Sequence, residues 1–323
     1  MRSFLTGIAA AAALLGAAPV TAQAGAAGNC PLAQLTAELG EFAITGKMPP
    51  GLGKSMFDPV AQRVSPFKAF DNVYFVGICF VSAWLITDPA GDILIDTLYE
   101  PHVDTLAANI TAVGAKLADI RYVLITHGHI DHAAGAARLK PLLPNARFVM
   151  TQKGWDEAIE NAASSAARLR PWTMIAPDIV AKEGDKITVG QTVVTVYETP
   201  GHTLGTASYG YTVRDGGNAY RAVTVGGLGL NAIKNVAQVE AYVAGVERLR
   251  AMAADLKDPI SVSLTVHPPV AGMFPMADKL AARKAGEPNP FVDRASFQAQ
   301  LAQLLKNSEE RLAIEKAKVA GGK

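Results

Sequence analysis

Hydrophobic and polar residues alternate along this chain in a pattern that predicts many short strands and fewer helices. Runs rich in β-branched and aromatic residues, bounded by turn residues, are typical of strands. We predict strands at residues 73–76, 81–87, 92–96, 122–126, 147–151, 186–189, 192–198, 206–212, 220–225 and 261–266. Apolar residues at helical spacing predict helices at residues 32–42, 103–117, 133–139, 155–168, 236–256 and 294–316.

The order of these elements favours one layered domain. Each half of the chain runs from strands through a loop to a helix, which predicts an α+β fold with two facing sheets and helices outside. Trp84 is expected in the core, and residues 172–177 are expected to border a cleft. The charged residues of the last helix should cover a solvated face, and residues 319–323 should form a frayed tail.

Composition and charge narrow the class of ligand. The chain has 323 residues, of which 50% are hydrophobic, so a sizeable core can form. Lys and Arg number 30 against 29 Asp and Glu, which gives a net charge of +1. Without basic runs, this balance argues against nucleic acid or an anionic membrane as the ligand. We expect a small-molecule substrate and a monomer.

The N-terminal segment predicts export. Residues 1–24 have a positive start at Arg2, an apolar stretch too short to span a bilayer, and an Ala-Gln-Ala cleavage site. We expect a mature domain at residues 25–323 in the periplasm, without a membrane anchor, in which residues 25–68 form an arm that packs across the domain.

The chain has two cysteines, Cys30 and Cys79. In an oxidising compartment they can pair, but Cys79 lies in an apolar strand context, where a buried free thiol fits equally well. Neither cysteine has a Cys or His neighbour at zinc-finger spacing, so the sequence does not support a structural zinc site.

A six-residue stretch after a predicted buried strand holds three of the six histidines and one aspartate. His127 and His129 are two residues apart on a turning backbone, so both can face one cation. Asp131 and His132 lie further along the chain and can face a second cation. Imidazole and carboxylate are ligands that zinc prefers, and Gly128 should let the backbone pass close to the metals. The alternative, a solvated loop, is disfavoured because half of all histidines lie here.

Two further histidines stand at predicted strand ends. His202 lies in a Pro-Gly-His turn after the strand at 192–198, and His267 follows the strand at 261–266 and precedes two prolines. Both are therefore candidate metal ligands. His102 precedes a predicted helix, and we expect it near the helix start without a metal.

The His-x-His-x-Asp-His pattern, with the later Pro-Gly-His turn and strand-end His-Pro, resembles the metallo-β-lactamase superfamily. Within it the chain looks most like the third subclass of class B β-lactamases. Other stretches with counterparts there are residues 71–77, 82–86, 93–96 and 288–291. The resemblance covers roughly residues 65–310 and implies an αββα sandwich, the metallo-β-lactamase fold.

The resemblance also implies two zinc ions. The first would be held by His127, His129 and His202, and the second by Asp131, His132 and His267. Asp96 would be the carboxylate that accepts the free N–H of a ligating imidazole.

Paired zinc ions acidify water and polarise carbonyls, so the expected reaction is hydrolysis. Asp131 is expected to orient the nucleophile and accept its proton, besides binding a metal. The expected substrate is a β-lactam, namely a penicillin, cephalosporin or carbapenem. The alternatives are hydrolysis of another cyclic amide or ester, such as a lactone, and a non-catalytic zinc-binding protein.

One stretch departs from the resembled subclass. That subclass has serines that help hold the β-lactam carboxylate, whereas this chain reads Val-Gly-Gly-Leu-Gly-Leu-Asn at residues 225–231. We expect Gly227 and Asn231 to contact substrate, β-lactam hydrolysis to be weak, and Gly227→Ser to restore an anchor. No Asp lies between Ala222 and Asn231, where relatives that cleave lactones, thioesters or phosphoesters place a metal-bridging one, which disfavours those substrates.

Overall fold

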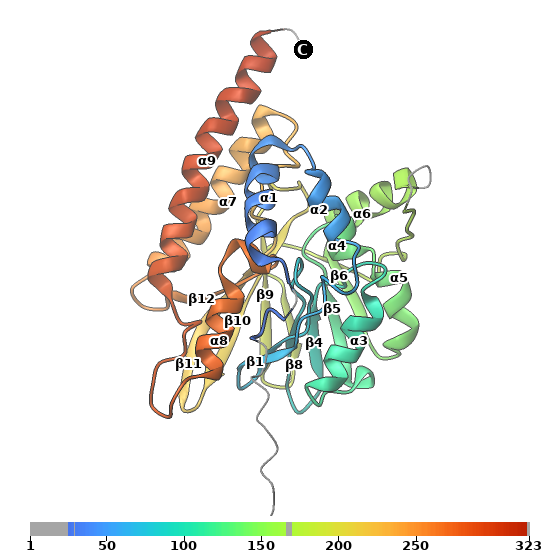
Figure 1. Ribbon diagram of the computed structural model, residues 1–323, viewed down its shortest axis with the longest axis vertical. Helices are drawn as coiled ribbons and strands as arrows, with labels where there is room; N and C mark the ends of the chain where they lie inside the picture. Colours follow the sequence, from blue (N-terminus) through green and yellow to red (C-terminus); the bar gives the residue numbers. More distant parts are fainter. Residues whose placement is uncertain (1–24, 29, 166–169, 322–323) are drawn as a thin grey trace, which may run out of the picture.

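Two β-sheets lie face to face between layers of helices (Figure 1). The computed structural model describes residues 25–28, 30–165 and 170–321; the predicted leader, residues 166–168 of a predicted helix and the last two residues lie outside them. The α+β prediction and the αββα arrangement are both confirmed.

The larger sheet combines an antiparallel half with a parallel half. Its strands lie in sequence order: β1 (Phe67–Phe70), β2 (Val73–Phe75), β3 (Trp84–Ile86), β4 (Asp92–Ile95), β5 (Ile120–Leu124), β6 (Arg147–Thr151) and β7 (Ile179–Ala181). Pairs from β1 to β4 are antiparallel and pairs from β4 to β7 are parallel. Every residue of β4 is buried, as expected for a strand covered on both faces.

The smaller sheet is mostly antiparallel. Its order is β12-β11-β10-β9-β8, made of β8 (Lys186–Val189), β9 (Thr192–Glu198), β10 (Ala207–Asp215), β11 (Asn218–Val225) and β12 (Ile260–Thr265). The pair of β11 and β12 is parallel. Buried and more exposed residues alternate along β9, so this strand packs one face on the core.

Helices lie on both outer faces and over the edge where strands of both sheets end (Figure 1). They are α1 (Leu32–Thr45), α2 (Pro50–Ser55), α3 (Val103–Ala112), α4 (Ile130–Ala133), α5 (Ala136–Leu139), α6 (Gln152–Ser164), α7 (Val236–Ala254), α8 (Met273–Ala281) and α9 (Arg294–Ala320). In Figure 1, α7 and α9 lie beside the smaller sheet, and α3, α5 and α6 lie beside the larger one. Among the described residues, no helix is both long and apolar enough to cross a membrane.

Buried aromatic residues tie the two sheets together. Trp84 is fully buried and its Nε1 donates to the carbonyl of Thr265 on the opposite sheet at 2.9 Å. Tyr209 donates from its hydroxyl to the carbonyl of Ile125 at 2.8 Å. The prediction that Trp84 belongs to the core is confirmed, and both bonds fix the strand ends that precede the histidine loops.

A disulfide anchors the N-terminal arm to the domain. Cys30 is bonded to Cys79, which resolves the alternative that the sequence left open. The bond joins the start of α1 to the loop between β2 and β3. Through it, α1 is held across the edge where the strand ends of both sheets meet (Figure 1).

Several element boundaries differ from the predictions. The strand expected at 81–87 is confined to Trp84–Ile86, because two backbone hydrogen bonds, from Val76 to Ala83 and from Ile78 to Val81, close the preceding residues into a tight loop. The helix expected at 133–139 is split into α4 and α5. The edge strands β1 and β7 and the helix α8 were not predicted.

The last helix also differs. It continues to Ala320, so the tail predicted from residue 319 onward is wrong for its first two residues. Two of its charged residues, Arg311 and Glu315, are only 7% and 2% exposed, so the predicted fully solvated charged face is wrong at these positions. They form a buried ion pair of 2.8 Å, and Arg311 also donates to the carbonyls of Leu230 and Ile233.

Candidate metal centre

The histidines and Asp131 come together at one edge of the sandwich, where strands of both sheets end. β5 ends at Leu124, and the chain reaches α4 with His129 as its N-cap residue. The first turn of α4 then carries Asp131 and His132. His202 follows β9 and His267 follows β12, so three segments far apart in sequence supply the candidate ligands.

One cluster consists of three imidazoles. His129 Nδ1 lies 3.1 Å from His127 Nε2 and 3.1 Å from His202 Nε2. Two atoms bound tetrahedrally to one zinc ion at 2.0–2.1 Å are about 3.3 Å apart, so this spacing suits a shared cation. The structure thus brings together the three residues that the resemblance implied for a first metal.

A second cluster consists of one carboxylate and two imidazoles. His132 Nε2 lies 3.3 Å from both Asp131 Oδ2 and His267 Nε2. His267 Nε2 lies 3.7 Å from the same carboxylate oxygen. These separations also suit a common cation. Both clusters can therefore hold a divalent metal.

Hydrogen bonds on the far side of three rings orient them toward the clusters. His202 Nδ1 donates to the carbonyl of Gly229 at 2.7 Å, and His267 Nδ1 donates to the carbonyl of Phe80 at 3.0 Å. His132 Nδ1 donates to Asp96 Oδ2 at 2.8 Å. A ring that donates from Nδ1 leaves the Nε2 lone pair for a metal, so these bonds select the ligating tautomer.

Asp96 lies behind both clusters. Besides His132, it accepts from the backbone N–H of Thr126 at 2.8 Å and from the Thr126 hydroxyl at 3.0 Å. That hydroxyl lies 3.1 Å from His127 Nδ1 and can accept a hydrogen bond from its N–H. Asp96 itself has a φ of 65°, an uncommon left-handed conformation that the surrounding bonds hold in place.

Burial and charge set the protonation of the ligands. Burial lowers the pKa of His129 to about 4 and that of His202 to about 3, and it also lowers the pKa of His127 and His267. Burial would lower the pKa of His132 too, but the carboxylates of Asp131 and Asp96 outweigh it and raise this pKa to about 10. Four imidazoles are thus neutral, while a metal must displace a proton from His132.

The remaining predicted residues are also placed by the structure. His102 lies at the start of α3 and outside both clusters, as predicted; its Nε2 lies 2.7 Å from the carbonyl of Met56. Gly128 packs against α6. A Cβ at Gly128 would lie 2.6 Å from the backbone nitrogen of Ala158, so the close approach that the structure shows at this glycine is that of α6.

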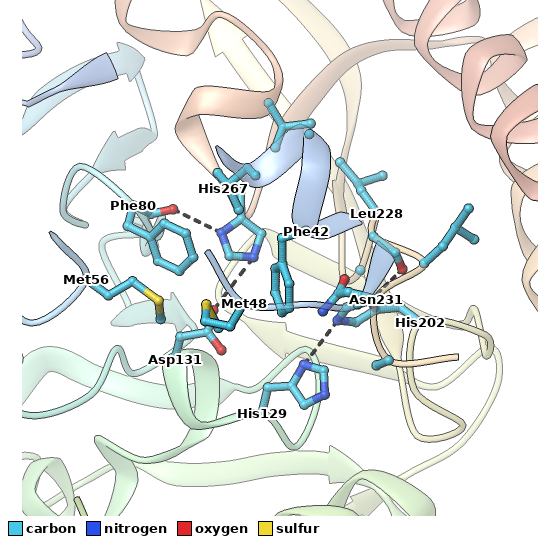
Figure 2. A pocket seen from close by; sticks show the side chains of 18 of the residues that line it. Phe42, Met48, Met56, Phe80, His129, Asp131, His202, Leu228, Asn231 and His267 are labelled. Carbon is cyan, nitrogen blue, oxygen red and sulfur yellow. Dashed lines mark hydrogen bonds and ion pairs between the residues drawn. The ribbon is translucent and has the colours of Figure 1, made fainter. Parts of the chain in front are cut away.

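A cavity of about 830 Å³ opens over both clusters. Gly227 and Asn231 line it, as does Trp172, so the segment expected to border a cleft does so. The sequence did not predict that the N-terminal arm completes the wall through Phe42 and Met48 (Figure 2). Leu304 and Asn307 of α9 also line the cavity, and this was not predicted either. The apolar side chains of α1 were the available signal, but nothing in the sequence placed them at this edge.

Close packing explains two glycines in residues 225–231, the glycine loop. A Cβ at Gly227 would lie 2.6 Å from the Cβ of His202, and a Cβ at Gly226 would collide with the carbonyl of Ala207. The expectation that Gly227→Ser would restore a substrate anchor is therefore wrong, because the serine would displace a candidate metal ligand.

Comparisons with known proteins place parts of this chain beside one family and several relatives. The model of the metallo-beta-lactamase superfamily matches residues 76–215. A curated hydroxyacylglutathione hydrolase of Rhodopseudomonas palustris is 32% identical over 126 residues, which cover 39% of this chain and 41% of the relative. An uncharacterised protein of Mycobacterium leprae is 31% identical over 96 residues, 27% of this chain and 43% of the relative. The chain thus spans less than half the length of these curated relatives.

Solved structures cover more of the chain. A subclass B3 metallo-beta-lactamase of Bradyrhizobium japonicum is similar over 83% of this chain and 99% of its own, with a TM-score of 0.70 and 28% identity. The native metallo-beta-lactamase of Legionella gormanii is similar over 79% of this chain and 98% of its own, with a TM-score of 0.69 and 27% identity.

Proposed function

Because the chain belongs to the metallo-β-lactamase superfamily, we propose that it is a hydrolase whose metal ions are held by the two clusters. The observation that carries this proposal is the convergence of two sets of three ligand atoms on the floor of one cavity. A structural metal site has four protein ligands, whereas three leave a position for water or substrate.

Zinc is the metal that we propose. Five imidazoles and one carboxylate are borderline ligands that suit zinc, and harder cations such as Mg²⁺ and Ca²⁺ prefer oxygen. His127, His129 and His202 would hold one ion, and Asp131, His132 and His267 the other. When bound, zinc supplies polarisation of the scissile carbonyl and acidification of the attacking water.

Asp131 has a second role in this proposal. Its Oδ2 makes the close contacts with His132 and His267, and the residue also lines the cavity. We assign its other carboxylate oxygen to orienting the attacking water and accepting its proton. Hydrolysis then forms a C–O bond from water, breaks the amide C–N bond and returns the proton to the leaving nitrogen.

A β-lactam is the substrate that we propose. The support is the similarity to subclass B3 metallo-beta-lactamases over almost their whole length. Binding should be weak, because Gly226 and Gly227 offer no hydroxyl to the substrate carboxylate. One lost hydrogen bond to a charged group corresponds to about 1.5–3 kcal/mol, or a roughly ten- to hundredfold higher KM. Asn231, also in the cavity wall, is the remaining polar candidate in this loop.

A thioester is the second candidate substrate. It is favoured by the curated relatives named as hydroxyacylglutathione hydrolases, although the matched segments cover less than half of them. The absence of an Asp between Ala222 and Asn231 disfavours it.

Steady-state kinetics distinguish these candidates. Zinc-loaded protein and its His129→Ala variant should be assayed with a penicillin, a cephalosporin, a carbapenem, an acyl-homoserine lactone and a glutathione thioester. We expect zinc-dependent β-lactam turnover with a high KM, lost in the variant. Turnover of the lactone or the thioester far above that of every β-lactam would overturn the proposed substrate. Absence of turnover with every compound would support a non-catalytic zinc-binding protein.

We also propose export to the periplasm. The disulfide between Cys30 and Cys79 supports this location, since disulfides persist in oxidising compartments. Sequencing the N-terminus of protein from a periplasmic extract tests it. The expected terminus follows Ala24, and an intact Met1 would contradict the leader.

A further inference from the structure

The cavity above the metal clusters is mainly apolar. Side chains from three separate parts of the chain face it: Leu39, Phe42 and Met48 from the arm, Leu228 and Leu230 from the glycine loop, and Leu304 from α9. Figure 2 shows Phe42 between His267 and His202, so this apolar wall begins directly at the candidate ligands. A substrate whose reacting bond reaches the clusters must lie against it.

The polar residues of the wall, away from the candidate ligands, are neutral. They are Thr36, Asn161, Asn231 and Asn307, and none of the described residues that line the cavity is Lys or Arg. Apart from the metals, the wall therefore has no cationic side chain for a carboxylate. The recognition that it offers is burial of apolar surface with a few carboxamide contacts.

Apolar side chains at this cavity remain partly exposed. Met48 is 49% exposed and Val270 is 44% exposed, although both line the cavity. Neighbouring apolar side chains that stay partly exposed in a concave site are typical of a ligand-binding surface. A bound apolar group would remove this surface from water.

We propose that the substrate carries an extended, uncharged apolar acyl group, which binds between α1 of the arm and α9. This inference rests on the proposed hydrolase function and adds the substituent that the site selects. The scissile amide or ester lies at the metal clusters, and Phe42 and Leu304 contact the acyl chain. These two residues are the proposed determinants of specificity.

A homologous series measures this selectivity. Penicillins with linear N-acyl groups from acetyl to decanoyl differ only in methylenes, and p-nitrophenyl esters of the same acids vary the reacting bond. Burial of one methylene is worth about a fourfold gain in affinity. We expect kcat/KM to rise by up to about fourfold per methylene until the cavity is filled.

Two variants test the assigned wall. Phe42→Ala and Leu304→Ala should each flatten the dependence on chain length, because each removes a contact surface of the acyl group. Leu256→Ala is the matched control, since Leu256 is 89% exposed and does not line the cavity. Zinc content and circular dichroism establish that each variant is folded, and either variant alone suffices if the other fails to fold.

The outcomes separate this inference from the proposed function. Penicillin turnover that rises with chain length supports both. Penicillin turnover independent of chain length, or chain-length dependence unchanged in both folded variants, overturns the inference and leaves the function intact. A length-dependent rate confined to the esters supports the apolar acyl group but overturns the β-lactam proposal. Absence of turnover in both series overturns both.

Discussion

His132 donates from Nδ1 to Asp96 Oδ2 at 2.8 Å, and both side chains are fully buried. The same carboxylate reaches the other cluster through the hydroxyl of Thr126, which lies beside His127. One acid therefore orients a ligand of each candidate metal. Because Asp96 is connected to both clusters, it should affect metal binding more than a residue that orients a single ligand.

Asp96→Asn should weaken metal binding by about ten- to a hundredfold. An amide presents one acceptor and one donor group, whereas the site supplies only donors to Asp96, from Thr126 and His132. In the variant, the amide NH2 group would therefore face a donor of Thr126 or His132 and find no acceptor. Competition with a chromogenic chelator measures the affinity, and Asp104→Asn, an exposed residue, is the control. Unchanged zinc affinity in Asp96→Asn would refute the orienting role.

His267→Ala should reduce the bound zinc from two ions per chain to one. The substitution removes one of three ligands of the second cluster and leaves the first cluster intact. His102→Gln is the control, because His102 is a buried histidine that lies outside both clusters. Metal analysis after reconstitution is the measurement. An equal loss in both variants would show that general destabilisation, and not ligation, explains the effect.

Removal of the disulfide should destabilise the protein. The bond joins residues separated by 49 positions, and the chain-entropy model gives about 4 kcal/mol for a loop of this length. Urea unfolding of wild type and of Cys30→Ser/Cys79→Ser, each with and without reductant, measures the change. Reductant should lower the stability of wild type and leave the double variant unaffected. Equal stability of the oxidised wild type and the double variant would contradict the prediction.

Arg311→Met should destabilise the protein, by less than the about 3–5 kcal/mol of a fully unpaired buried charge, because Glu315 loses its arginine partner and keeps only Lys318. Arg311→Met/Glu315→Leu should cost less, since both charges are removed. Arg311 also holds the loop that contains Gly229, the acceptor for His202. Urea unfolding gives the free energies; a double variant that is less stable than the single one would refute this account.

Ionisation of Asp92 should lower the free energy of unfolding as the pH rises. Burial raises its pKa to about 6 from an ordinary value of 3.8, so the folded state holds the proton more tightly than the unfolded state. Ionisation of the buried carboxyl lowers the free energy of unfolding. This loss is absent below pH 3.8, grows between pH 3.8 and about 6, and is complete above pH 6. Asp92→Asn should therefore stabilise the protein above pH 6, by up to about 3 kcal/mol, and much less at pH 4. A gain independent of pH would contradict the assignment.

The sequence predicted the elements whose pattern is strong. β9 matches its predicted range because its alternation is regular, and the central strands and α7 follow from long apolar or periodic runs. β1 and β7 have four and three residues, too few to show a period, and their pairing with neighbours defines them. The burial of Arg311 likewise depends on carbonyls of a distant loop, which no local pattern reveals.

The candidate ligands could be identified from the sequence because six residues carry all the donor atoms. The part of the wall that α1 and α9 form above them could not. Phe42 and Leu304 are 262 positions apart, and only the arrangement of α1 and α9 across the strand ends brings both to one cavity. Close packing around Gly227 was also hidden, since the sequence shows a missing side chain but not the imidazole that requires it.

Zinc titration of metal-free wild type tests the central claim most directly, with bound zinc and hydrolysis of a chromogenic cephalosporin followed in the same samples. The account predicts two zinc ions per chain, one for each cluster, and turnover that appears only as the clusters fill. A protein that binds no zinc at micromolar concentrations, or one that hydrolyses the cephalosporin equally well after chelation, would contradict it.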